Sequence, residues 1–241
     1  MKLYDFTQAY LEIVNASVER NTKELPAILS CLDFEGKECL EIGTGVLARL
    51  AIKLSGFAKH ITCLERYEAT VEAAKKAIKE KNLEKTITVE LSKDKTKLPF
   101  PDKSFDVVYG AWLPTSLTSN PAYLDELARV SRNHILLIVS GPIGDIPPMV
   151  DLVKPGSEAE RRLEQQRAMQ EHFKRLGYEV RITEETLKLD FPTKEAIRGT
   201  FYCFDFDNAL TPEQQKKVNA YLDPKTHDFK DNFYCLHAWK K

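Results

Sequence analysis

The sequence predicts an α/β protein built on an open, doubly wound parallel sheet with helices on both faces. Two observations predict this class. From residue 37 to residue 140, short apolar or β-branched segments alternate with segments of helical periodicity. Several of the short segments are apolar throughout, as is typical of strands buried on both faces of a parallel sheet. Right-handed crossovers join such strand–helix units into an open sheet.

The N-terminal 35 residues carry two apolar stripes at helical spacing, so we expect them to be mainly helical. The alternating region follows from Lys37. Its strands are expected at residues 38–41, 60–65, 86–91, 105–110 and 135–139. Its helices are expected at residues 48–55, through Val71, Ala74 and Ile78 to Lys81, and at residues 121–130.

The pattern changes after residue 140. A loop rich in glycine and proline precedes a long charged helix, expected from about residue 158 to 176. An outer strand is expected at residues 178–183, a helix that begins at Thr211-Pro212-Glu213, and a final strand at residues 232–239. We expect a single domain over 1–241, with 1–35 as a helical cover, 36–140 as a cofactor-binding half and 141–241 as a substrate-side half.

Composition excludes several classes of protein. The 35 Lys and Arg nearly balance the 36 Asp and Glu, giving a formal net charge of -1, which argues against a general polyanion binder. We find no apolar run of about 20 residues, the length needed to cross a bilayer, and no secretory signal pattern at the start. The 5 cysteines are scattered, without a CxxC pair. We therefore expect a reduced, cytoplasmic protein without a metal site.

The most informative motif is the turn Gly43-Thr44-Gly45, which follows the first strand and precedes a helix. Two glycines there remove side chains where the backbone must approach a ligand. About twenty residues later, the second strand ends on Glu65, the spacing at which a carboxylate reaches the ribose hydroxyls of a nucleoside cofactor. These two features predict an enzyme that binds a nucleoside cofactor.

The segment 43–48 also fits the G-x-G-x-x-A form of the dinucleotide fingerprint, so an NAD(P)-dependent oxidoreductase is an alternative. Three further features bear on the choice between the two cofactors. Glu41, however, would repel a pyrophosphate and suits a cofactor with a cationic centre. Asp94, after the third strand, is placed to accept from an adenine amino group, although it is also suited to capping the following turn.

The third feature is the turn Leu98-Pro99-Phe100-Pro101-Asp102, which runs directly into Ser104-Phe105-Asp106-Val107-Val108. With these motifs the chain resembles the class I S-adenosylmethionine-dependent methyltransferases. It is most similar to their small-molecule branch, which includes the ubiquinone and menaquinone biosynthesis enzymes. The resemblance covers residues 36–140 well and extends loosely to the last strand. It implies a Rossmann-like methyltransferase fold, a mostly parallel seven-stranded sheet with an antiparallel last strand.

The resemblance also implies a cofactor site. Its residues would be Glu41, Gly43, Thr44, Gly45, Glu65, Arg66, Asp94, Lys95 and Ala111. The glycines would line the methionine portion of S-adenosylmethionine, Glu65 would bind both ribose hydroxyls, and Asp94 the adenine amino group. Arg66 and Lys95 would flank the adenine, and Gly110, Ala111 and Trp112 would lie under the transferring methyl. The family usually has a third glycine where this chain has Leu47, a residue we expect to begin the following helix.

No catalytic residue is assigned. Methyl transfer from a sulfonium needs mainly alignment and the exclusion of water, because the leaving thioether requires no proton. If a general base acts, the candidates are His172, His227, His237, Tyr202 and Asp205. Among these, His172 is expected at the surface of the charged helix. Asp106 is expected to be a structural acid.

The leading hypothesis is methyl transfer to a small-molecule acceptor. The alternatives are the NAD(P)-dependent oxidoreductase and an S-adenosylmethionine-binding protein without catalysis. A nucleic-acid acceptor is not expected, because the chain has no basic stripe with interleaved aromatic residues. The sequence leaves the acceptor, the methylated atom and the oligomeric state (monomer or homodimer) open.

Overall fold

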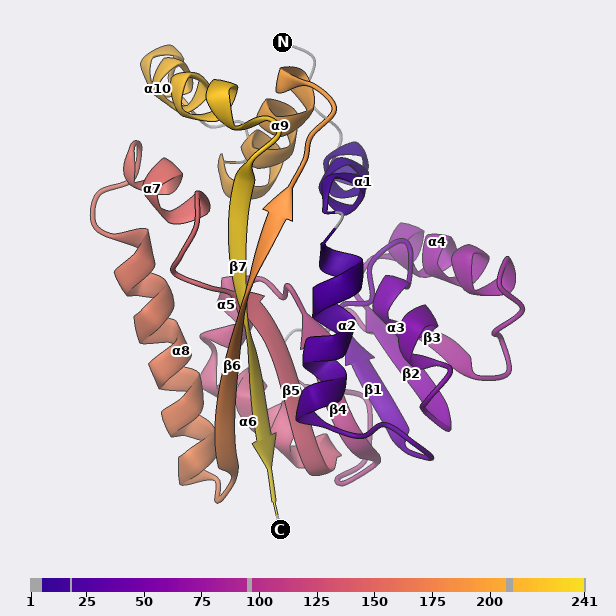
Figure 1. The fold of residues 1–241 in the computed structure, drawn as a ribbon. Helices are drawn as coiled ribbons and strands as arrows, with labels where there is room; N and C mark the ends of the chain where they lie inside the picture. Colours follow the sequence, from indigo (N-terminus) through magenta and orange to yellow (C-terminus); the bar gives the residue numbers. More distant parts are fainter. Residues whose placement is uncertain (1–5, 18, 95–96, 207–209, 241) are drawn as a thin grey trace. The chain divides into compact units, whose positions relative to one another are not determined.

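A computed structural model of the chain describes residues 6–17, 19–94, 97–206 and 210–240 (Figure 1). Within those residues there is a seven-stranded sheet in the order β3-β2-β1-β4-β5-β7-β6. The pairs β3–β2, β2–β1, β1–β4 and β4–β5 are parallel, whereas β7 is antiparallel. Helices lie on both faces. The predicted fold class is confirmed.

The strands of the sheet are β1 Glu38–Ile42, β2 His60–Glu65, β3 Ile87–Leu91, β4 Phe105–Ala111, β5 Ser131–Ser140, β6 Glu179–Leu189 and β7 Phe229–Trp239. The α-helices of the described residues are α1 Phe6–Ala16, α2 Arg20–Cys31, α3 Arg49–Leu54, α4 Glu68–Lys79, α5 Thr115–Thr118, α6 Pro121–Val130, α7 Ile146–Asp151, α8 Glu158–Arg175, α9 Lys194–Phe201 and α10 Pro212–Leu222. A π-helical segment, Tyr202–Phe206, follows α9, and a 3₁₀ turn, Asp223–Lys225, follows α10.

The strand order reverses at β1, which pairs with β2 on one side and with β4 on the other. In this register Leu40 lies opposite Val108, and Glu41 lies opposite Tyr109. Ligands of open α/β sheets bind beyond the carboxyl ends of the strands at such a switch point. The glycine turn follows β1 and therefore lies there.

The two faces of β1 serve different purposes. Leu40 and Ile42 belong to an apolar core that also contains residues of α6 and α8, such as Leu127 and Phe173. Side chains alternate along a strand, so Cys39 and Glu41 point to the opposite face. Glu41 therefore points into the protein on the face of the sheet opposite to that of Leu40 and Ile42.

The chain divides into two compact units. The first comprises Met1–Pro26, Ser140–Glu164 and Glu184–Phe233, and the second comprises Ala27–Val139, Gln165–Thr183 and Tyr234–Lys241. Each has an apolar core of its own: the core just described lies in the second unit, and an aromatic core lies in the first. In the first unit the rings of Phe201 and Phe229 stack with centroids 4.4 Å apart.

Most expected elements are present, and several differ. The strands expected at residues 135–139 and 178–183 extend to Ser131–Ser140 and Glu179–Leu189. The loop rich in glycine and proline contains α7, which has proline in its first turn, where the missing N–H costs no hydrogen bond. No helix in the part of the chain that the structure describes is long and apolar enough to cross a membrane.

Candidate cofactor site

The turn after β1 requires its two glycines. Gly43 has φ 70° and Gly45 has φ 69°, the left-handed region that side chains other than glycine rarely adopt. The Gly43 amide donates to Leu64 O at 2.9 Å, which ties the turn to β2. The turn continues through Leu47 to Ala48, the N-cap of α3. The expectation that Leu47 begins the helix was therefore wrong, because the chain needs those residues to complete the turn.

Glu65, the last residue of β2, lies against this turn. Its Oε1 accepts a 2.7 Å hydrogen bond from the Gly45 amide, and its Oε2 accepts one of 3.1 Å from the Arg66 amide. Only 9% of the residue is exposed. The structure therefore brings together the two motifs from which the nucleoside cofactor was predicted, an acid at the tip of β2 and a glycine turn after β1.

Glu41 is directed into the protein beneath the same turn. Its Oε2 accepts a 2.7 Å hydrogen bond from the Thr44 hydroxyl and a weak one, at 3.5 Å, from the Cys63 thiol. Burial raises the pKa of Glu41 to about 7, although the hydrogen bonds from Thr44 and Cys63 act in the opposite direction. The carboxyl group thus acts on the turn through Thr44.

The remaining predicted residues are less closely associated. The Arg66 guanidinium lies 5.7 Å from the centre of the Tyr67 ring, and Ala111 is the last residue of β4. Asp94 is exposed, three residues beyond β3, and its Oδ1 accepts a 3.1 Å hydrogen bond from the Lys97 amide. That bond is the turn-capping role offered by the sequence. Lys95 lies outside the described residues.

Sequence reasoning missed Leu113, which covers the glycines from the loop after β4. A Cβ at Gly43 would lie 2.9 Å from Leu113 Cδ2, and one at Gly110 would lie 2.8 Å from Leu113 Cδ1. The preceding residue, Trp112, adopts φ 58°, a strained conformation for a large side chain. Its amide donates to Ile138 O at 2.8 Å, which holds this bend in place. The one signal in the sequence for a side chain packed this closely was the pair of glycines, Gly43 and Gly110, at the ends of two neighbouring strands.

Arg129 of α6 was also missed. Its guanidinium binds Glu126 through two 2.7 Å hydrogen bonds, and it also donates to Asp102 at 2.9 Å. Further bonds reach the carbonyl oxygens of Leu98 and Phe100. The turn before β4, on which the family resemblance partly rests, is thus held by one arginine from α6.

The acid–base candidates differ in their surroundings. His172 was expected at the surface but is only 6% exposed, and its Nε2 lies 2.9 Å from Oδ1 of Asp125 in α6, within hydrogen-bond distance. His227 is exposed and pairs with Asp190, and His237 packs against Trp239 with ring centroids 4.9 Å apart.

The other two candidates lie in the π-helical segment of the first unit. The Tyr202 hydroxyl donates to Asn219 Oδ1 at 2.6 Å. The Asp205 carboxylate has no hydrogen bond or ion pair to any other residue that the structure describes. Burial raises its pKa to about 7, against the attraction of Arg162. Of the five candidates, Asp205 therefore combines a carboxylate that makes no hydrogen bond to another described residue with a pKa near neutral pH.

Asp106, expected to be structural, accepts from the Glu38 amide at 2.9 Å and from Arg132 at 2.9 Å. Burial works to raise its pKa, but these donors outweigh burial and hold the pKa below its usual range. The prediction of a structural role is confirmed by these contacts.

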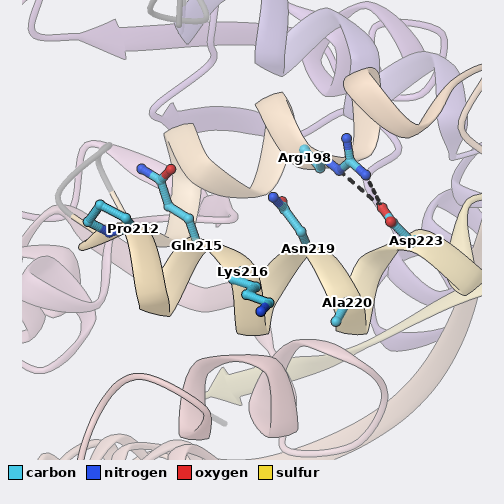
Figure 2. Close-up of a pocket in the computed structure, with 7 residues that line it drawn as sticks. All are labelled: Arg198, Pro212, Gln215, Lys216, Asn219, Ala220 and Asp223. Carbon is cyan, nitrogen blue, oxygen red and sulfur yellow. Dashed lines mark hydrogen bonds and ion pairs between the residues drawn. The ribbon is translucent and has the colours of Figure 1, made fainter.

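An open surface groove of about 460 Å³ lies along α10 (Figure 2). Its lining residues are Arg198, Pro212, Gln215, Lys216, Asn219, Ala220 and Asp223. Arg198 and Asp223 form an ion pair across one end, so the charges of the groove largely satisfy one another. Every lining residue belongs to the first unit, whereas Glu41, Gly45 and Glu65 belong to the second. In the described ranges no group of three or more His, Cys, Asp or Glu side chains could hold a metal ion.

The comparison with protein families decides the class of this site. Residues 40–139 match the family described as "Methyltransferase domain". This segment resembles a methyltransferase domain. It contains the glycine turn, Glu65 and Asp94, and it implies S-adenosylmethionine as the cofactor. The predicted family resemblance, enzyme class and cofactor are thereby confirmed.

Solved structures agree in fold. The YcgJ protein of Bacillus subtilis has a TM-score of 0.62 at 18% identity, covering 89% of this chain and 96% of its own. A putative methyltransferase of Bacillus halodurans has a TM-score of 0.62 at 15% identity, covering 91% and 99%. A SAM-dependent methyltransferase of Aquifex aeolicus has a TM-score of 0.57 at 14% identity, covering 95% and 97%. No curated protein matches the sequence significantly.

Proposed function

We propose that this methyltransferase transfers a methyl group from S-adenosylmethionine to a small-molecule acceptor by in-line displacement. The observation that carries the proposal is the 2.7 Å hydrogen bond between Gly45 and Glu65. It joins the glycine turn and the acid at the switch point of the sheet, where an adenosyl cofactor binds in this fold. The buried but polar setting of Glu65 suits a ligand that presents hydroxyl groups.

The chain's own residues fit such a cofactor. In this proposal Glu65 accepts from the ribose hydroxyls, and the Asp94 carboxylate accepts from the adenine amino group. Gly43 and Gly45 leave backbone bare beside the methionine portion, with Ala111 close by. Thr44 and Arg66 complete the part of the site that the structure describes. Leu113, packed against Gly43, supplies an apolar wall that excludes water from the reacting end.

The reaction requires little acid–base chemistry from the protein. When bound, the cofactor supplies a methyl group whose bond to sulfur breaks as its bond to the acceptor forms, with the electron pair staying on sulfur. The protein aligns the acceptor and keeps water away.

A small acceptor is supported by the resemblance of residues 36–140 to the small-molecule branch of the class I methyltransferases. The nearly balanced charge argues against nucleic acid. A cytoplasmic location remains a proposal, supported by the five cysteines, all of which are free thiols.

Ligand-dependent thermal unfolding tests the cofactor, and an acceptor screen tests the reaction. S-adenosylhomocysteine and S-adenosylmethionine should each raise the melting temperature, whereas NAD and NADP should not. A ligand at a hundredfold excess over its Kd stabilises the folded state by about 2.7 kcal/mol. Formation of S-adenosylhomocysteine with a panel of small acceptors should then exceed that of a no-acceptor control. Binding without turnover on any acceptor would favour the non-catalytic alternative, and stabilisation by NAD or NADP alone would overturn the cofactor assignment.

A further inference from the structure

Four polar side chains form a buried cluster beneath the glycine turn. This turn cluster consists of Glu41, Thr44, Cys63 and Tyr109, and no member is more than 5% exposed. β1, β2, β4 and the turn itself each supply one of them. Buried polar groups are costly unless they are hydrogen-bonded, so a cluster at this position calls for a physical explanation.

The Tyr109 hydroxyl is the anomaly in the turn cluster. It is fully buried, and no described residue accepts or donates a hydrogen bond of good geometry with it. It nevertheless lies close to Glu41. Burial chiefly, and then the charge of Glu41, raise the pKa of Tyr109 well above its usual value. An unsatisfied buried hydroxyl beside a carboxyl group is a donor that a small rotation would bring into use.

The groups around Glu41 act on its carboxylate in opposite directions. From β2, Cys63 donates weakly and the charge of Glu65 repels; from α3, the charge of Arg49 attracts. Tyr109 faces it from β4. The net result, with the pKa of Glu41 raised to about 7 by burial, is that charged and neutral forms are both populated near neutral pH.

We propose that Glu41 is a proton-linked positioning residue, whose charged form fixes the turn through Thr44 and Tyr109 and favours the cationic cofactor over its neutral-sulfur product. The inference rests on the proposed function, because it concerns how S-adenosylmethionine and S-adenosylhomocysteine bind the same turn. The charged carboxylate accepts only, so it holds the Thr44 hydroxyl as a donor and recruits the Tyr109 hydroxyl as a second donor. The neutral acid has a proton of its own to donate, and this arrangement is lost.

The direction of the pH dependence follows from linkage. A sulfonium near the turn stabilises the charged carboxylate, so it lowers the pKa of Glu41 in the complex and its binding releases a proton. Affinity for S-adenosylmethionine therefore rises as the pH increases from about 6 to about 8. The change is about tenfold for each pKa unit by which the cofactor lowers the pKa of Glu41. S-adenosylhomocysteine lacks the sulfonium charge, so its affinity changes less, and the protein discriminates most strongly against product at the alkaline end.

Calorimetric titration of the full chain with each compound, from about pH 6 to about pH 8, tests this. The ratio of the two Kd values should shift several-fold toward S-adenosylmethionine as the pH rises. Buffers of different ionisation enthalpy should report proton release with S-adenosylmethionine. In Glu41→Gln, which keeps the shape but cannot titrate, the ratio should change with pH only through the titration of the ligands themselves. The titration of the ligands' own ammonium groups is common to both proteins and cancels in this comparison.

Tyr109→Phe separates positioning from a merely structural role. Loss of the second donor should raise the pKa of Glu41 further and move the midpoint of the affinity change to higher pH. Tyr178→Phe is the matched control, because it removes a buried hydroxyl that donates to Ala128 O instead. It should leave the midpoint unchanged. Thr44→Val should weaken both ligands, and Thr44→Ser, which keeps the hydroxyl, should restore binding.

The outcomes are distinguishable. If both compounds bind the wild type with a ratio that does not change with pH, the inference is overturned and the proposed function stands. The inference also fails if Glu41→Gln retains the wild-type pH dependence. If neither compound binds at any pH, the proposed function itself fails. Should Glu41→Gln not fold, the midpoint shift of Tyr109→Phe relative to Tyr178→Phe decides the matter.

Discussion

The backbone amide of Gly45 donates a 2.7 Å hydrogen bond to the Glu65 carboxylate, across a separation of 20 residues in sequence. The carboxylate thus holds the glycine turn and also stands at the tip of β2, where we propose that it binds ribose. The two roles share one side chain, so a change at Glu65 affects both the shape of the turn and its ligand.

Glu65→Ala should abolish the rise in melting temperature that S-adenosylhomocysteine produces. It should also lower the stability of the free protein by about 2 kcal/mol, because a hydrogen bond to a charged acceptor is lost. Differential scanning fluorimetry with and without ligand measures both effects. Glu90→Ala removes an exposed acid from the neighbouring strand β3 and serves as the control. Ligand stabilisation that survives in Glu65→Ala would remove Glu65 from the site.

Gly110→Ala should destabilise the protein by about 1–3 kcal/mol, because the added methyl group meets Leu113 and comes within 3.2 Å of Ile42 O. Leu113→Ala makes room for it, so the double variant should recover part of the loss. Urea unfolding of the four proteins gives the coupling energy, expected at about 1 kcal/mol or more. Additive effects would show that Leu113 does not pack against Gly110 in solution.

Arg129→Met should cost on the order of 3 kcal/mol, since it leaves Glu126 partly buried without its partner and frees the turn at residues 98–102. Arg129→Lys should recover only part of this, because an ammonium group cannot reproduce the two parallel bonds to Glu126. The exposed pair Lys75–Glu72 provides the comparison, and Lys75→Met should change the free energy of unfolding by less than about 1 kcal/mol. Equal costs for Arg129→Met and Lys75→Met would contradict the anchoring role.

Asp205→Asn should stabilise the protein more at pH 8 than at pH 5. The folded-state pKa of Asp205 is raised to about 7, so the wild-type folded state holds a proton that the unfolded state has released. Stability consequently falls as the pH rises from about 4 to about 7, by up to about 3 kcal/mol between pH 5 and pH 8. Asparagine removes this dependence. Chemical denaturation at the two pH values measures it, with the exposed Asp228→Asn as control.

Local signals in the sequence predicted much of the fold. The strand at residues 60–65 and the helix at residues 121–130 have the predicted bounds. Asn120 caps that helix and Pro121 begins it, and Thr211 with Gln214 forms a capping box before α10. Such capping residues mark in the sequence where a helix begins. Helix α7 escaped prediction because its prolines mark a first turn as readily as a loop.

Tertiary contacts account for what the sequence left open at the site. The proximity of Glu65 and Gly45 was predictable, because the carboxyl ends of parallel strands share one edge of the sheet. The partner of His172 was not, since Asp125 belongs to another helix. The inward direction of Glu41 follows from its place in β1, one residue from the core position Leu40, but its contact with Tyr109 depends on the register of β1 against β4.

The loop after β5 provides a last constraint. A Cβ at Gly141 would lie 1.7 Å from Asn232 Oδ1, an atom that also accepts a 3.0 Å hydrogen bond from the Ile143 amide. Neither position can therefore change alone. A larger residue at 141 displaces the Asn232 side chain, which holds the loop, and a smaller residue at 232 leaves the backbone N–H of Ile143 without its acceptor. Across the descendants of this chain the two positions should co-vary, with glycine retained wherever asparagine is retained.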